Sequence, residues 1–228
     1  HRRPSRMDPA MTHRAALALT AALMLITACS RPPAPTGPTP VPEPPQIREL
    51  PGRGVAVEGH GSATSDEVVP QYGGGLTVGI DVVTLTHNGQ STFIVTALQG
   101  QQSENVATAI GAYKGQRPLV VQGPVSFQVT ADGAWTLQIQ PLPSGGKPAF
   151  SGTGDAVSPY FPPPQPQSWN VAHDGQSAFF VYAHCLGGSI VVEDKTGVFQ
   201  DTPQVEFPRG PCFWEVRADG AWNLTPAP

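Results

Sequence analysis

An internal repeat restricts the fold of this chain more than any other sequence feature. The segment THNGQSTFIVTAL (86–98) matches AHDGQSAFFVYAH (172–184), and GPVSFQVTADGAWTL (123–137) matches GPCFWEVRADGAWNL (210–224). A looser match pairs SDEVVP (65–70) with GDAVSP (154–159). Three matches in the same order at nearly one offset predict two copies of one structural unit. We therefore expect two modules, at 54–141 and 150–227, joined by a segment rich in proline and glycine at 141–149.

Each module has the two-residue alternation of β-strands. Phe93, Val95 and Ala97 alternate with polar or smaller residues, and the stretches that begin at Val125 and Trp135 behave in the same way. Asn-Gly and Asp-Gly pairs at 88–89, 132–133, 174–175 and 219–220 separate such stretches and predict hairpin turns. The segment 105–113 is the one helix candidate. The expected fold is all-β, with two tandem antiparallel β-sandwich-like modules related by the internal repeat.

The N-terminal region has the pattern of an export signal. After Met11, or Met7 as an alternative start, a short basic stretch precedes an apolar run at 15–26, and Thr27, Ala28 and Cys29 follow. The run is about a dozen residues long, which suits a signal peptide and is too short to span a bilayer as a stable helix. An ordinary secretory signal with an incidental cysteine is the alternative to the interpretation that follows.

Ile26-Thr27-Ala28-Cys29 resembles the lipobox of bacterial lipoproteins. The resemblance implies that signal peptidase II removes residues 1–28 and that Cys29 carries acyl chains. Two or three acyl chains give stable membrane anchoring, whereas a single chain gives only marginal binding. The expected location is therefore the extracytoplasmic face of a cell membrane, with the lipid bilayer as a partner.

A proline-rich stretch follows the expected anchor. Segment 31–46 reads RPPAPTGPTPVPEPPQ, in which proline removes backbone donors and fixes φ. It should be an extended polyproline II arm of roughly 50 Å. We interpret 29–53 as a tether that lifts the modules from the membrane. The simplest hypothesis is that this tether is a passive spacer without a binding partner of its own.

Charge and composition restrict the class of partner. Charged residues are 13% of the chain and the net charge is -4, so the chain offers no basic field for nucleic acid.

The repeat itself, through its H-[DN]-G-x-S-x-F and ADGxW motifs, resembles a module of actinobacterial envelope lipoproteins and secreted proteins. That resemblance supports location and fold and implies no activity.

Two cysteines remain once Cys29 is assigned to lipid. Cys185 continues the inward face of Phe179, Val181 and Ala183, and Cys212 shares a face with Trp214. In an oxidising compartment this even pair predicts a Cys185–Cys212 disulfide. Two buried free thiols are the alternative, because inward parity does not establish the distance between the side chains.

The recurring histidines are candidate catalytic residues. His87 and His173 recur with Ser91 and Ser177 and with Asp132 and Asp219, which raises a Ser-His-Asp triad as a possibility. Neither module has a nucleophile elbow of the G-x-S-x-G kind, and a histidine before an Asn-Gly or Asp-Gly turn more often bonds the turn backbone. We expect no catalytic residue, no cofactor and no metal site, since the histidines lack the close pairing of zinc ligands.

The second module differs from the first on its outer face. Its strands carry Phe180, Tyr182, His184 and Phe213, where the first module has smaller or more polar residues. This aromatic patch is the candidate binding surface, because a monomer rarely leaves such a patch in water. It could equally pack against the first module or lie under the loop 160–167.

The expected function is that of a non-enzymatic binding or adaptor module for an envelope protein or glycan. A cell-envelope hydrolase that uses His87 or His173 and a purely structural spacer are the alternatives.

Overall fold

The computed structural model describes residues 43–70 and 79–228. The described residues between 43 and 228 form one compact unit of strands and loops without helix, and the all-β class agrees with the prediction from the sequence. No helix in the described residues could cross a membrane. The expected signal peptide, Cys29 and most of the tether lie outside the described residues.

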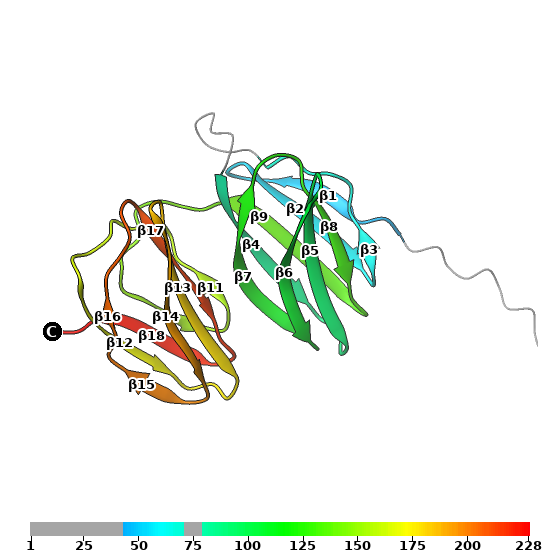
Figure 1. The fold of residues 1–228 in the computed structure, drawn as a ribbon. Helices are drawn as coiled ribbons and strands as arrows, with labels where there is room; N and C mark the ends of the chain where they lie inside the picture. The colour runs from blue at the N-terminus through cyan, green and yellow to red at the C-terminus, as the bar shows by residue number, and fades with distance from the viewer. Residues whose placement is uncertain (1–42, 71–78) are drawn as a thin grey trace, which may run out of the picture. The chain divides into compact units, whose positions relative to one another are not determined.

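The first module contains two facing antiparallel sheets (Figure 1). One sheet has the order β1-β2-β9-β4-β7 and the other the order β3-β8-β5-β6. Their strands are, in chain order, β1 (Gln46–Leu50), β2 (Gly54–His60), β3 (Ala63–Thr64), β4 (Gly79–His87), β5 (Thr92–Gln99), β6 (Gln102–Ile110), β7 (Tyr113–Val121), β8 (Ser126–Thr130) and β9 (Ala134–Pro141).

The second module repeats this arrangement without a counterpart of β1. Its sheets have the orders β10-β18-β12-β15, with β16 also paired to β12, and β11-β17-β13-β14. The strands are β10 (Phe150–Thr153), β11 (Ala156–Val157), β12 (Gln167–His173), β13 (Ala178–Cys185), β14 (Gly188–Thr196), β15 (Phe199–Asp201), β16 (Gln204–Val205), β17 (Cys212–Arg217) and β18 (Ala221–Pro226). The two strand orders therefore correspond, as the repeat predicts.

The inward-facing side chains of the alternating strands fill the space between the two sheets of each module. Phe93, Val95 and Ala97 of β5 are buried, as are Trp135, Leu137 and Ile139 of β9, and the residues between them are more exposed. The second module likewise buries Phe179, Val181 and Ala183 of β13 and Trp222 and Leu224 of β18. These buried faces form a separate core in each module.

The segment at 105–113, expected as a helix candidate, is strand instead. It covers most of β6, the turn that follows and the first residue of β7, and β6 pairs with β5. The register shifts between Val95 and Thr96 of β5, so Val106 is an extra residue in β6 and lies next to buried Ala107. A bulge of this kind interrupts the two-residue period and gives a local pattern that imitates a helix.

The Asn-Gly and Asp-Gly pairs are not hairpin turns, contrary to the sequence prediction. β4 and β5 belong to different sheets, as do β8 and β9, so the pairs at 88–89 and 132–133 are corners where the chain crosses between sheets. Their glycines do not have positive φ, whereas Gly100 and Gly188, which lie in the true hairpins β5–β6 and β13–β14, do. The crossing explains why these pairs recur at one end of both modules.

Two further predictions from the sequence, the end of the tether and the alignment of the loose match, differ from the structure. The tether was expected to continue to residue 53, but β1 (Gln46–Leu50) pairs with β2 along its whole length and belongs to the first sheet. The loose match of 65–70 with 154–159 is out of register. The hydroxyl of Ser65 accepts the amide of Phe127 and that of Ser158 accepts the amide of Trp214, so Ser65 corresponds to Ser158.

Candidate functional site

The recurring histidines hold the sheet-crossing corners together. Nδ1 of His87 lies 2.9 Å from the carbonyl of Gly111, and Nδ1 of His173 lies 3.0 Å from that of Gly197. Because a carbonyl oxygen only accepts, Nδ1 donates in both modules. The opposite nitrogen, Nε2, faces Asp132 or Asp219 at 3.3 Å.

The two aspartates use their second oxygen to hold the neighbouring corner. Oδ2 of Asp132 accepts the amides of Gln90 and Ser91, and Asp219 binds the equivalent amides in the second module. The amide of Gln90 is the largest influence that lowers the pKa of Asp132, with the amide of Ser91 and the charge of His87 acting in the same direction. Ser91 and Ser177 thus enter this cluster through their backbone amides, an arrangement that organises a turn.

The Cys185–Cys212 disulfide is present. The two residues are direct cross-strand partners of β13 and β17, and Cys212 is fully buried. Inward parity on the two neighbouring strands was therefore a correct guide to the pairing.

The aromatic patch forms one continuous row. The ring of Phe180 stacks on Tyr182, Tyr182 on His184, and His184 on Phe213, with centroid separations of 6.3, 5.8 and 5.0 Å. Arg217 lies over Tyr182, with its guanidinium carbon 5.5 Å from the ring centroid. The row follows the outer face of the sheet that contains β13 and β17.

The two ends of this row have different surroundings. Phe213 is 5% exposed and packs with Val82 and Leu142 in an apolar cluster that also includes Val157, while the ring of Tyr160 meets it edge-on. Phe180, Tyr182 and His184 are half-buried. The Phe213 end therefore packs against the first module and the start of the loop 160–167, so the four residues are not exposed together.

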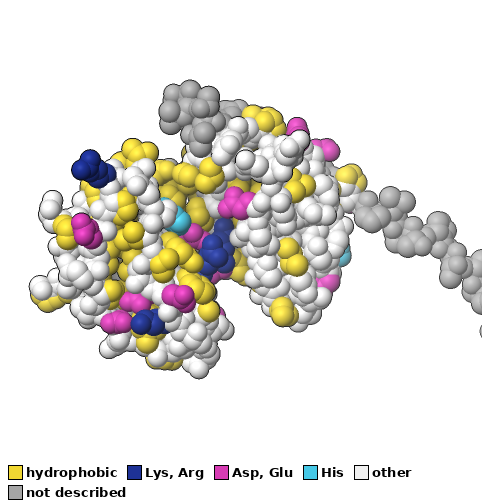
Figure 2. Space-filling model, in the orientation of Figure 1, with side chains coloured by type: hydrophobic (Ala, Val, Ile, Leu, Met, Phe, Trp, Pro, Cys, Tyr) yellow, Lys and Arg dark blue, Asp and Glu magenta, His cyan; other side chains and the backbone are white. Residues whose placement is uncertain are grey.

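A cleft of about 910 Å³ lies beside His184 and Phe213 of the row. Strands β4, β6 and β7 of the first module form one wall, and β13, β14, β17 and the loop at 160–162 form the other. Figure 2 shows hydrophobic side chains around a hollow that also contains basic, acidic and histidine groups. The volume is in the range of small-molecule sites, which are concave and mostly apolar.

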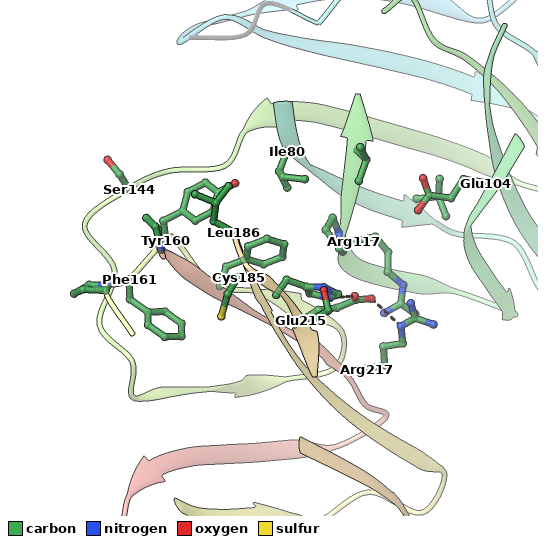
Figure 3. Close-up of a pocket in the computed structure, with 18 of the residues that line it drawn as sticks. Ile80, Glu104, Arg117, Ser144, Tyr160, Phe161, Cys185, Leu186, Glu215 and Arg217 are labelled. Atoms are coloured by element: carbon green, nitrogen blue, oxygen red, sulfur yellow. Dashed lines mark hydrogen bonds and ion pairs between the residues drawn. The ribbon is translucent and has the colours of Figure 1, made fainter. Parts of the chain in front are cut away.

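The cleft has an apolar end and a charged end (Figure 3). Ile80, Tyr160 and Leu186 line the apolar end, and Leu186 is 86% exposed. Arg117, Glu215 and Arg217 lie at the opposite end. Such an amphipathic lining matches a ligand that is itself part apolar and part polar.

Glu215 is the central carboxylate of the charged end. It is buried, its Oε2 lies 2.9 Å from Nε2 of His184, and its Oε1 accepts Nε of Arg217 at 2.8 Å. Burial acts to raise the pKa of Glu215, but the hydrogen bond from His184 and the charge of Arg217 outweigh it, so the pKa is lowered. Glu215 is therefore ionised at neutral pH and occupied on both oxygens.

Asp155 joins the modules next to this carboxylate. Its Oδ2 accepts the Tyr113 hydroxyl at 2.6 Å and Nη2 of Arg117 at 3.0 Å, and its Oδ1 accepts the amide of Ala218. Burial is the largest of the influences that raise the pKa of Tyr113, which keeps the hydroxyl protonated as the donor. Tyr113 and Arg117 belong to β7, so this carboxylate ties the first module to the second.

Sequence reasoning missed Arg117, Glu215 and Arg217. A signal was available for two of them, because Glu215 and Arg217 continue the outward positions of Phe213 on β17, where the first module has Gln128 and Thr130. Arg117 gave no such signal, since only the contact between modules brings it to the cleft. In the described residues no cluster of three or more histidine, cysteine or acidic side chains could hold a metal ion.

No protein-family model matches the chain, and no curated protein matches it.

Proposed function

We propose that this protein is a non-enzymatic binding protein of the bacterial cell envelope, held at the membrane by acyl chains on Cys29, and that its ligand occupies the cleft between the modules. The cleft is the observation that carries the proposal. It combines a large apolar wall with a few fixed polar groups, which is the composition of ligand sites in general.

The histidine clusters support the non-enzymatic part of the proposal. Nδ1 of each ring is bound to a carbonyl, Nε2 faces the aspartate, and the neighbouring serine is bound through its amide. A general base needs a ring nitrogen directed at a nucleophile or substrate. The same geometry in both modules is better explained by a structural role. We call each histidine–aspartate pair, His87 with Asp132 and His173 with Asp219, the corner clasp.

Photo-crosslinking in the native envelope tests the site. A photoreactive residue placed at Leu186, which lines the cleft, should yield one adduct of defined mass. The matched control is Val198, which is 65% exposed and does not line the cleft. Equal labelling at both positions, or no adduct at Leu186, would contradict a ligand site in the cleft.

Mass spectrometry tests the anchor separately. The native protein should begin at Cys29 and carry the added mass of its acyl groups, and a Cys29→Ser variant should leave the membrane fraction. An intact N-terminus or an unmodified Cys29 thiol would exclude the lipoprotein assignment without bearing on the cleft.

A further inference from the structure

The charged end of the cleft has hydrogen-bond donors in excess. Both oxygens of Asp155 and both oxygens of Glu215 already accept hydrogen bonds. Nη1 of Arg117, in contrast, is buried and has no partner in the described residues. A buried donor without a partner is costly, and a complementary acceptor on a ligand would remove that cost.

Arg217 adds donors from the opposite wall. Its Nε is used by Glu215, while its side chain remains 46% exposed and lines the cleft. Figure 3 shows the guanidinium groups of Arg117 and Arg217 at the same end of the site. Guanidinium groups bind planar or tetrahedral anions through paired N–H donors, which makes this end suited to a carboxylate or phosphate.

Glu104 is the one further acid on this part of the cleft. It lies on β6 at the exposed rim, where partial burial and then the charge of Glu215 raise its pKa. The ionised Glu104 carboxylate would repel an anion held by the arginines. Removal of Glu104 should therefore strengthen binding, whereas removal of Arg217 should weaken it. A variant that had simply lost its fold could not bind more tightly.

The remainder of the lining indicates the other half of the ligand. Ile80, Val120, Leu186, Pro211 and Phe213 supply apolar surface to the lining, and Ile80 and Leu186 lie at the opposite end from the arginines (Figure 3). A protein partner would need a broad interface of about 800 Å² on each side, whereas a concave apolar cleft suits a narrow chain. The apolar and anion-binding parts together describe one amphiphile.

We infer that the cleft binds an amphiphile that carries a hydrocarbon chain and a single carboxylate or phosphate head group. This inference rests on the proposed function and specifies its ligand. The head group contacts Arg117 and Arg217, and the chain lies along the apolar surface toward Leu186.

Calorimetric titration of the full chain tests the inference. The Cys29→Ser form, prepared without detergent, removes competition from acyl chains of the protein itself. Dodecanoate and dodecyl phosphate should bind, and the tighter of the two identifies the head group. Dodecanol, acetate and inorganic phosphate, which each lack one half of the amphiphile, should bind at least about tenfold more weakly, as the loss of one charged hydrogen bond implies.

Three variants locate the head group. Arg217→Gln should weaken dodecanoate binding about tenfold, and Glu104→Gln should strengthen it at neutral pH. Arg209→Gln is the matched control, because Arg209 is exposed and does not line the cleft, and it should have no effect. Circular dichroism of each variant checks that the fold is retained.

Two results would overturn the inference. One is that neither dodecanoate nor dodecyl phosphate binds, and the other is that binding is as tight for dodecanol or for Arg217→Gln. An adduct of a neutral lipid or a glycan at Leu186 would likewise reject the anionic head group while leaving the proposed function intact. Absence of any adduct in the cleft would reject both.

Discussion

At the scale of single residues, close packing in the corners explains why certain residue types recur. A Cβ atom on Gly175 would lie 2.0 Å from Oδ1 of Asp219 and 2.5 Å from Nε2 of His173, and Gly89 is equally confined in the first module. The sequence showed that these residues recur, and chemistry suggested a turn. It could not show that the histidine and aspartate belong to two corners that clasp each other, because that contact joins distant segments.

Substitution of Gly175 tests the clasp. Gly175→Ala should lower the free energy of unfolding by about 1–3 kcal/mol, because the added methyl group forces the carboxylate and imidazole apart. Gly123→Ala is the control, since a Cβ there has nothing within 4 Å, and the expected change is within about 0.5 kcal/mol. Denaturant unfolding measures both, and equal stability of the two variants would argue against the clasp.

A buried acid makes stability depend on pH. Asp81 is 2% exposed, and burial raises its pKa from 3.8 to about 6. The folded state therefore binds the proton more tightly than the unfolded state, and the free energy of unfolding decreases as pH rises from about 4 to about 6. The cost of the charged form is about 3 kcal/mol above that interval.

Asp81→Asn removes this cost. The variant should gain up to about 3 kcal/mol of stability at pH 7.5 and almost nothing at pH 4, relative to the native chain. Asp194→Asn, at an exposed position, should change stability little at either pH. Urea unfolding at both pH values provides the measurement, and a gain that is independent of pH would show that ionisation is not its cause.

At the scale of strands and sheets, two-residue alternation was a sufficient guide to most of the fold. It identified the buried faces of β5, β9 and β17 and placed Cys185 and Cys212 on one side. It failed at Val106, where a bulge breaks the period, and at the Asn-Gly and Asp-Gly pairs. The residue types of those pairs correctly indicated that the chain turns there. They did not reveal which sheet the next strand joins.

The disulfide should stabilise the second module selectively. It closes a separation of 27 residues, for which chain entropy implies about 3–4 kcal/mol. In the Cys185→Ala/Cys212→Ala variant, hydrogen exchange should therefore accelerate more in β13 and β17 than in β5 and β8. Cys29→Ala is the control and should leave both modules unchanged, whereas equal loss of protection in both would indicate that the disulfide acts on the whole unit.

At the scale of the whole described unit, the sequence left open a contact between the aromatic patch and the first module, but it did not identify the residues that make the contact. The patch residues differ between the two copies, and the packing of Phe213 with Val82 and Leu142 partly explains that difference. Arg117 and Asp155 lie far apart in the sequence and belong to different modules. Their charges match many other residues equally well, so only the fold selects this pair.

Removal of Asp155 should uncouple the modules. Asp155→Ala leaves the Arg117 guanidinium and the Tyr113 hydroxyl without their acceptor, and we expect a loss of about 2–3 kcal/mol. Calorimetry should then resolve two unfolding transitions. Glu58→Ala breaks the exposed Arg48–Glu58 pair and should cost less than about 1 kcal/mol. A single transition of unchanged cooperativity in Asp155→Ala would contradict this coupling.

The contact at Asp155 is asymmetric, because the two modules contribute different residues to it. In the second module Phe199 occupies the place of Tyr113, since each is opposite the corner histidine, and it lacks the hydroxyl. In the first module Ser62 occupies the place of Asp155, since each accepts the amide of the equivalent alanine, and it lacks the charge. A head-to-tail contact with two competent ends on every copy would propagate into a fibre. Here the first module supplies the tyrosine and arginine and the second module supplies the aspartate, so the contact within one chain leaves neither half free to pair with another chain.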